Sequence, residues 1–72
     1  MYEDEEYLRA IGLRIKEERE KQKLKQKELA ASCLFENASM SRIEAGKVNM
    51  SILTLKKIAN ALKTSVDTFL KD

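Results

Sequence analysis

Residues 26–46, QKELAASCLFENASMSRIEAG, fit two short helices that are each apolar on one face only. Apolar residues recur at helical spacing at Leu29, Ala30 and Cys33 in the first and at Met40 and Ile43 in the second. The opposite face of the second helix carries Asn37, Ala38, Ser41 and Arg42. These side chains are short or can pair with hydrogen-bonding edges, so the face suits insertion into a groove better than burial in a core.

The composition favours one small all-α domain. The chain has 72 residues, no proline, two glycines and 36% charged residues. A single core of this size is only marginally stabilising, which makes a compact helical unit and burial against a second copy reasonable expectations. We expect an acidic tail at residues 1–7 and one domain at residues 8–72.

Apolar periodicity and capping residues predict five helices. They cover residues 8–22, 26–33 and 36–45, a fourth helix after Ser51 and a short fifth after Ser65. Gly46 is expected to end the third helix in the left-handed conformation, and Gly12 to allow another helix close to the first. One face of the fourth helix carries Ile52, Leu55, Ile58, Ala59 and Leu62.

Two charged residues interrupt apolar stripes. Arg19 follows Leu8, Ile11 and Ile15 on the first helix, and Glu44 follows Met40 and Ile43 on the third. A lone buried charge is too costly, whereas a hydrogen-bonded pair is tolerated. We therefore predict that Arg19 and Glu44 meet in the core. The alternative is that each side chain reaches water at the end of its helix.

Several function classes find little support. Histidine is absent and Cys33 is the only cysteine, so neither a metal cluster nor an internal disulfide is indicated, and Cys33 is expected to pack in the core. No carboxylate or lysine pair is isolated for acid–base catalysis, so we expect no enzyme and no cofactor or small-molecule ligand. No apolar run approaches a membrane span, which favours a cytoplasmic protein without a membrane partner.

The net charge of +2 conceals an asymmetry along the chain. Four of the 12 acidic residues lie in the first seven positions, and the rest of the chain has 14 basic and 8 acidic residues. Residues 9–27 carry eight basic residues against three acidic ones. This excess is either a solvated helix face or a surface that meets phosphates.

The chain resembles the helix-turn-helix domains of the Cro and phage-repressor type, also called the xenobiotic-response-element family. The resemblance covers about residues 9–70, and the matching positions are Ile15, Arg19, Leu24, Gln26, Leu29, Ala30, Ile43, Glu44, Gly46, Asn49, Ser51, Leu55, Ile58, Ala59 and Leu62. The resemblance implies that residues 26–45 are the helix-turn-helix and that its second helix enters the DNA major groove.

The resemblance also implies residue roles. Bases would be read by Asn37, Ala38, Ser41 and Arg42. The DNA backbone would be contacted by Gln26, Ala45, Lys47 and Asn49, with sequence-independent attraction from Lys25, Lys27 and Lys47. The family also forms an internal salt bridge at the positions of Arg19 and Glu44. Two residues depart from its pattern, because Leu34 replaces the usual turn glycine and Lys25 the usual threonine cap.

Two functions from different classes remain open. The first is a sequence-specific double-stranded DNA-binding transcriptional regulator that acts as a homodimer on a near-palindromic operator. Its dimer interface would use Leu53, Val66, Phe69 and Leu70, unless these residues complete the core. The second is a helical protein-interaction module, such as an antitoxin-like partner, although such a face would be expected to expose more aromatic anchors.

Overall fold

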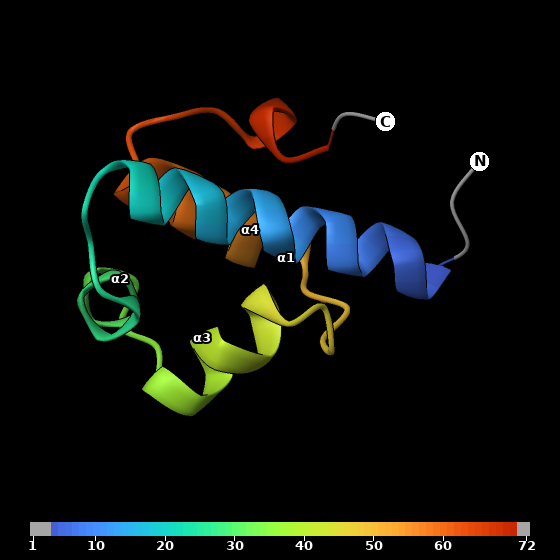
Figure 1. Ribbon diagram of the computed structural model, residues 1–72, viewed down its shortest axis with the longest axis horizontal. Coiled ribbons are helices and arrows are strands. Elements are labelled where there is room, and N and C mark those ends of the chain that lie inside the picture. The colour runs from blue at the N-terminus through green and yellow to red at the C-terminus, as the bar shows by residue number, and fades with distance from the viewer. Residues whose placement is uncertain (1–3, 71–72) are drawn as a thin grey trace.

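The computed structural model describes residues 4–70 and shows an all-α fold. Its elements are α1 (Asp4–Lys21), α2 (Gln26–Ser32), α3 (Asn37–Glu44), α4 (Ile52–Ala61) and a 3-10 turn, η1 (Val66–Thr68). The long helix α1 runs in front of α4 in the view of Figure 1, with α2 and α3 on one side of this pair and η1 on the other. The arrangement agrees with the predicted class, and no strand occurs among residues 4–70.

The predicted fifth helix is wrong. Residues 66–68 form a single 3-10 turn, and the Ser65 side chain makes no capping hydrogen bond to it. The segment is too short to close a stable α-helical turn of its own, and it folds back so that Phe69 is fully buried. Hydrogen bonds then attach it to α1, because Arg14 Nη1 donates to the Phe69 carbonyl at 3.1 Å and Tyr7 Oη to the Leu70 carbonyl at 3.4 Å.

The start of α1 also differs from the prediction. The helix begins at Asp4, so residues 4–7 of the predicted acidic tail are helical, while residues 1–3 lie outside the described part. Asp4, Glu5 and Glu6 occupy the first turn, where negative charge interacts favourably with the helix dipole. Tyr7 then ties this turn to the C-terminal segment.

The core contains buried side chains from all four α-helices and from Phe69, which directly follows η1. Its largest fully buried members are Phe69, Ile15, Leu29, Met40, Ile58 and Leu62. Cys33 is buried as predicted. Ile52 was predicted on the inner face of α4 but is 64% exposed, because it is the first residue of the helix, one turn before Leu55, the first residue of α4 that is buried. The predicted cap at Ser51 is confirmed, since its side chain accepts a hydrogen bond from the Thr54 N–H.

All four α-helices in residues 4–70 end in the same way, with a residue in the left-handed conformation. These residues are Lys23 (φ 60), Leu34 (φ 59), Gly46 (φ 74) and Lys63 (φ 58). After α2, for example, the Phe35 N–H donates to the Ala30 carbonyl at 2.9 Å and the Leu34 N–H to the Ala31 carbonyl at 3.1 Å. This Schellman pattern satisfies carbonyls that would otherwise lack partners. Of these four residues, only Gly46 is the glycine that usually occupies this position.

Gly12 brings α1 against the end of α3. A Cβ atom at this position would lie 2.6 Å from the carbonyl oxygens of both Ile43 and Glu44. Real Cβ atoms do not approach backbone oxygens so closely, so the contact requires glycine. The predicted close approach is confirmed, and it fixes the position along α1 at which the end of α3 packs.

Candidate nucleic-acid interface

Helix α3 has one buried and one exposed face. Met40 is fully buried and Ile43 is 4% exposed. The four residues predicted to read bases are all exposed, and they are Asn37, Ala38, Ser41 and Arg42. The structure therefore presents these four side chains to solvent from one short, anchored helix.

A buried ion pair attaches the end of α3 to α1. Arg19 Nε donates to Glu44 Oε2 at 2.8 Å and Nη2 donates to Oε1 at 3.1 Å, which confirms the predicted pairing. The third group of the guanidinium, Nη1, donates to the Leu24 carbonyl at 2.7 Å. The hydrogen bond to Glu44 raises the pKa of Arg19 above its ordinary value, although burial acts in the opposite direction. One arginine thus joins α1, the loop before α2 and the end of α3.

The beginning of α2 places three predicted DNA-backbone residues together. Lys25 and Lys27 are exposed, and Gln26 between them is half-buried. The Lys25 backbone N–H donates to Glu28 Oε1 at 2.7 Å, which supplies half of a capping box without the usual threonine. Gln26 Nε2 donates to Glu44 Oε1 at 3.1 Å, a contact that the sequence did not reveal.

The segment after α3 carries the remaining predicted backbone contacts. Ala45, Lys47 and Asn49 are all exposed. Lys47 shares a shallow hollow with Glu5 of α1, and Asn49 shares another with Asp4. The acidic first turn of α1 therefore borders this segment, so both signs of charge meet at this edge of the surface.

Lys16 is an interface candidate that the sequence prediction missed. It lines a hollow together with Gln26, Ser41, Glu44 and Ala45, which brings α1 to the same surface as α2 and α3. The signal was present in the sequence, because Lys16 lies four residues after Gly12 and so on the side of α1 that faces α3. Its exposed ammonium adds a positive charge beside residues already predicted to meet DNA.

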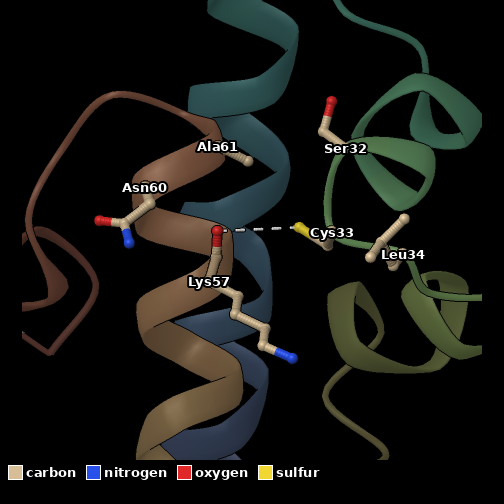
Figure 2. A pocket seen from close by; sticks show the side chains of 6 residues that line it. All are labelled: Ser32, Cys33, Leu34, Lys57, Asn60 and Ala61. Atoms are coloured by element: carbon tan, nitrogen blue, oxygen red, sulfur yellow. Dashed lines mark hydrogen bonds between the residues drawn. The ribbon is translucent and has the colours of Figure 1, made fainter.

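The turn between α2 and α3 lies beside another hollow, between the end of α2 and α4 (Figure 2). Leu34 adopts φ 59, which is strained for leucine, and it is 93% exposed, so its side chain contributes almost nothing to the core. Cys33 Sγ points instead toward α4, where it donates to the Lys57 carbonyl at 3.8 Å (Figure 2). The turn keeps the left-handed path that glycine would give.

The residues predicted for a dimer interface fall into different environments. Phe69 is fully buried in the single chain, so the alternative of core completion holds for it and the predicted interface role is wrong. Leu53 is 68% exposed, beside the exposed Ile52, while Val66 and Leu70 are half-buried.

Comparisons with known proteins agree with this geometry. No helix among residues 4–70 is long and apolar enough to cross a membrane. No protein of curated function matches the chain. The crystal structure of the restriction-modification controller protein C.AhdI from Aeromonas hydrophila superposes with a TM-score of 0.83 at 27% identity, covering 86% of this chain and 94% of that one. A helix-turn-helix family model matches residues 15–69. The chain therefore belongs to the Cro/repressor-type helix-turn-helix family of DNA-binding regulators.

Proposed function

We propose that the protein is a sequence-specific regulator of transcription that inserts α3 into the major groove of double-stranded DNA. The observation that carries this proposal is the row of exposed side chains on α3. This helix is itself held in place by the close contact at Gly12 and by the Arg19–Glu44 pair. A rigidly held helix can present base-reading groups without ordering them anew on binding. The similarity to a restriction-modification controller protein supports the same class of function.

The side chains of α3 differ in what they can read. Arg42 can direct its fork at O6 and N7 of guanine, and Asn37 can pair with N6 and N7 of adenine, each pairing being worth about 1–3 kcal/mol of discrimination. Ala38 offers a methyl contact, for example to thymine, and Ser41 adapts to either donors or acceptors. Specificity should therefore depend most on Arg42 and Asn37.

The residues around α3 supply binding that does not depend on base sequence. Lys25 and Lys27, before α3 in the chain, and Lys47, after it, are exposed, and Lys16 adds another exposed lysine from α1. Gln26, Ala45 and Asn49 complete the predicted set of backbone contacts. Lysines that neutralise phosphates release counterions, so affinity should fall steeply as salt increases.

A homodimer on a near-palindromic operator completes the proposal. Leu53, Val66 and Leu70 remain candidates for the interface, and the exposed Ile52 joins them. In such a dimer the two α3 helices would lie about 34 Å apart, one turn of duplex. Sedimentation at micromolar concentration tests this: Leu53→Lys should shift the protein toward a monomer, whereas Lys56→Ala on the same helix should not. A wild-type protein that is strictly monomeric would contradict the dimer.

The DNA-binding proposal is tested by selection of duplexes from a random-sequence pool with the wild-type protein. We expect a recurrent, near-palindromic consensus. The logarithm of the binding constant for this consensus should fall linearly with the logarithm of the salt concentration. Failure to enrich any consensus, with binding of equal strength to every duplex, would contradict sequence-specific recognition.

A further inference from the structure

Gln26 and Glu44 are joined by a hydrogen bond that links the start of α2 to the end of α3. Gln26 Nε2 donates to Glu44 Oε1 at 3.1 Å. The same oxygen also accepts from Arg19 Nη2 at 3.1 Å, while Oε2 accepts from Arg19 Nε at 2.8 Å. The Gln26 amide is therefore attached to the buried ion pair, although its residue stands at the predicted DNA surface.

The Glu44 carboxylate determines which way this amide faces. An ionised carboxylate only accepts hydrogen bonds, so the NH₂ group of Gln26 must face it and the carbonyl oxygen must face another direction. Arg19 holds the carboxylate with two bonds, and the Glu44 side chain is 3% exposed. The acceptor is thus fixed in place, and it allows one of the two amide orientations.

The amide lies where its orientation matters for binding. Gln26 is half-buried and lines a hollow with Ser41 and Ala45, which are a predicted base-reading residue and a predicted backbone contact. With one N–H engaged by Glu44, the group retains its carbonyl oxygen and one N–H for another partner. A free amide would have to lose rotational freedom when DNA binds, whereas this one is already ordered.

We propose that Glu44 is a positioning residue for DNA recognition, which holds the Gln26 amide in its binding orientation. The inference rests on the proposed DNA-binding function. It assigns the Arg19–Glu44 pair a second role beyond stability, because the pair sets the geometry of a group on the α2 side of the interface. Glu44 acts on DNA only through Gln26 in this account.

A double-mutant cycle tests this coupling on the consensus duplex selected with the wild-type protein. Gln26→Ala should weaken binding about tenfold, as expected for one hydrogen bond to a charged group. Glu44→Gln, whose amide offers both a donor and an acceptor, should weaken binding by a similar factor. The double variant should bind no more weakly than either single variant, because both remove the same contact. Multiplying effects, about a hundredfold in the double variant, would overturn the proposal.

Two controls separate positioning from general damage. Lys47→Ala removes an exposed charge after α3 that, in the proposal, binds DNA independently of Glu44. Its loss of affinity should therefore multiply with the loss caused by Glu44→Gln. Ile58→Val destabilises the core within α4 and should leave the affinity of the folded protein unchanged. If the wild-type protein selects no duplex, the proposed function itself fails. If it selects one and the effects of Gln26→Ala and Glu44→Gln multiply, only the positioning role fails.

A second measurement covers the case in which Glu44→Gln does not fold. In the free wild-type protein, the side-chain amide protons of Gln26 should exchange with solvent about tenfold more slowly than those of the exposed Asn60. The reason is that the Gln26 amide donates a hydrogen bond to the Glu44 carboxylate. Nuclear magnetic resonance resolves both groups. Equal exchange rates would show that the Gln26 amide turns freely, and the proposal would be wrong.

Discussion

Arg19 and Glu44 form a two-bonded ion pair between α1 and α3, with Nε–Oε2 at 2.8 Å and Nη2–Oε1 at 3.1 Å. Both side chains are almost completely buried, at 10% and 3% exposure. The pair lies at the end of the helix that carries the predicted base-reading residues. Its integrity therefore bears on both the stability of the domain and the placement of α3.

Arg19→Met should destabilise the protein severely. The substitution removes the three donor groups of Arg19 and leaves the Glu44 carboxylate buried among fewer partners. Breaking a buried pair in this way costs about 3–5 kcal/mol. Urea denaturation followed by circular dichroism measures the loss. A loss below about 0.5 kcal/mol would indicate side chains that are exposed in solution.

The double variant Arg19→Met with Glu44→Leu provides the matched control. It removes both charges, and apolar replacements of buried ion pairs are often neutral or stabilising. We expect it to recover most of the stability that the single variant loses. A double variant as unstable as Arg19→Met alone would show that packing, rather than the unpaired carboxylate, causes the loss.

Gly12→Ala should destabilise the protein even though alanine is the better helix former. Helix propensity alone would favour alanine by about 1 kcal/mol. The new Cβ would lie 2.6 Å from two backbone oxygens at the end of α3, which cannot move away as a side chain could. Overpacking of this kind costs about 1–3 kcal/mol, and α3 should shift outward and bind DNA less well. Thermal unfolding checks the sign: a higher melting temperature would contradict the tight contact.

Leu34→Gly should stabilise the protein, while Leu13→Gly should destabilise it. Leu34 has φ 59 and a side chain that is 93% exposed, so glycine removes strain and loses little burial. A left-handed conformation costs a residue other than glycine about 1–2 kcal/mol, which is the upper limit of the gain. Leu13 lies within α1 and is 52% exposed, so glycine there should cost about 1 kcal/mol. Equal effects at the two positions would show that the turn is not strained.

Cys33 should make the protein less stable at alkaline pH. Burial raises the pKa of its thiol above the ordinary value, although Lys57 acts in the opposite direction. The folded state therefore holds the proton more tightly than the unfolded state. The associated stability is fully present below about pH 8.5 and is lost as pH rises through the raised pKa. Unfolding of Cys33→Ala should show a weaker decline above that pH than wild type. Parallel curves would mean that the thiol does not contribute.

The sequence predicted those features of the fold that depend on local pattern. The interrupted stripes at Arg19 and Glu44 indicated a buried pair because two charges replaced apolar residues at helical spacing. Gly46 and Ser51 marked helix boundaries through their own conformational and capping preferences. The exposed face of α3 followed from the same periodicity.

Other features depend on tertiary contacts that no local pattern specifies. Lys23 and Lys63 end helices in a left-handed conformation that lysine rarely adopts. The conformation occurs here because the hydrogen bonds of the helix ends and the path of the chain compensate for its cost. Phe69 was ambiguous because a short apolar stripe looks the same whether it meets the core or a second copy. The bond from Gln26 to Glu44 joins residues 18 positions apart and became visible only once α2 and α3 were placed together.

The base preference of Arg42→Ala shows whether α3 reads bases. Duplexes should be selected in parallel with wild type, Arg42→Ala and the control Lys56→Ala, which removes an exposed charge from α4. We expect Arg42→Ala to lose about 1–3 kcal/mol of discrimination at one base pair in each half-site and to keep the rest of the consensus. Lys56→Ala should select the wild-type consensus. An unchanged consensus for Arg42→Ala, with affinity reduced equally for all duplexes, would contradict base reading by α3.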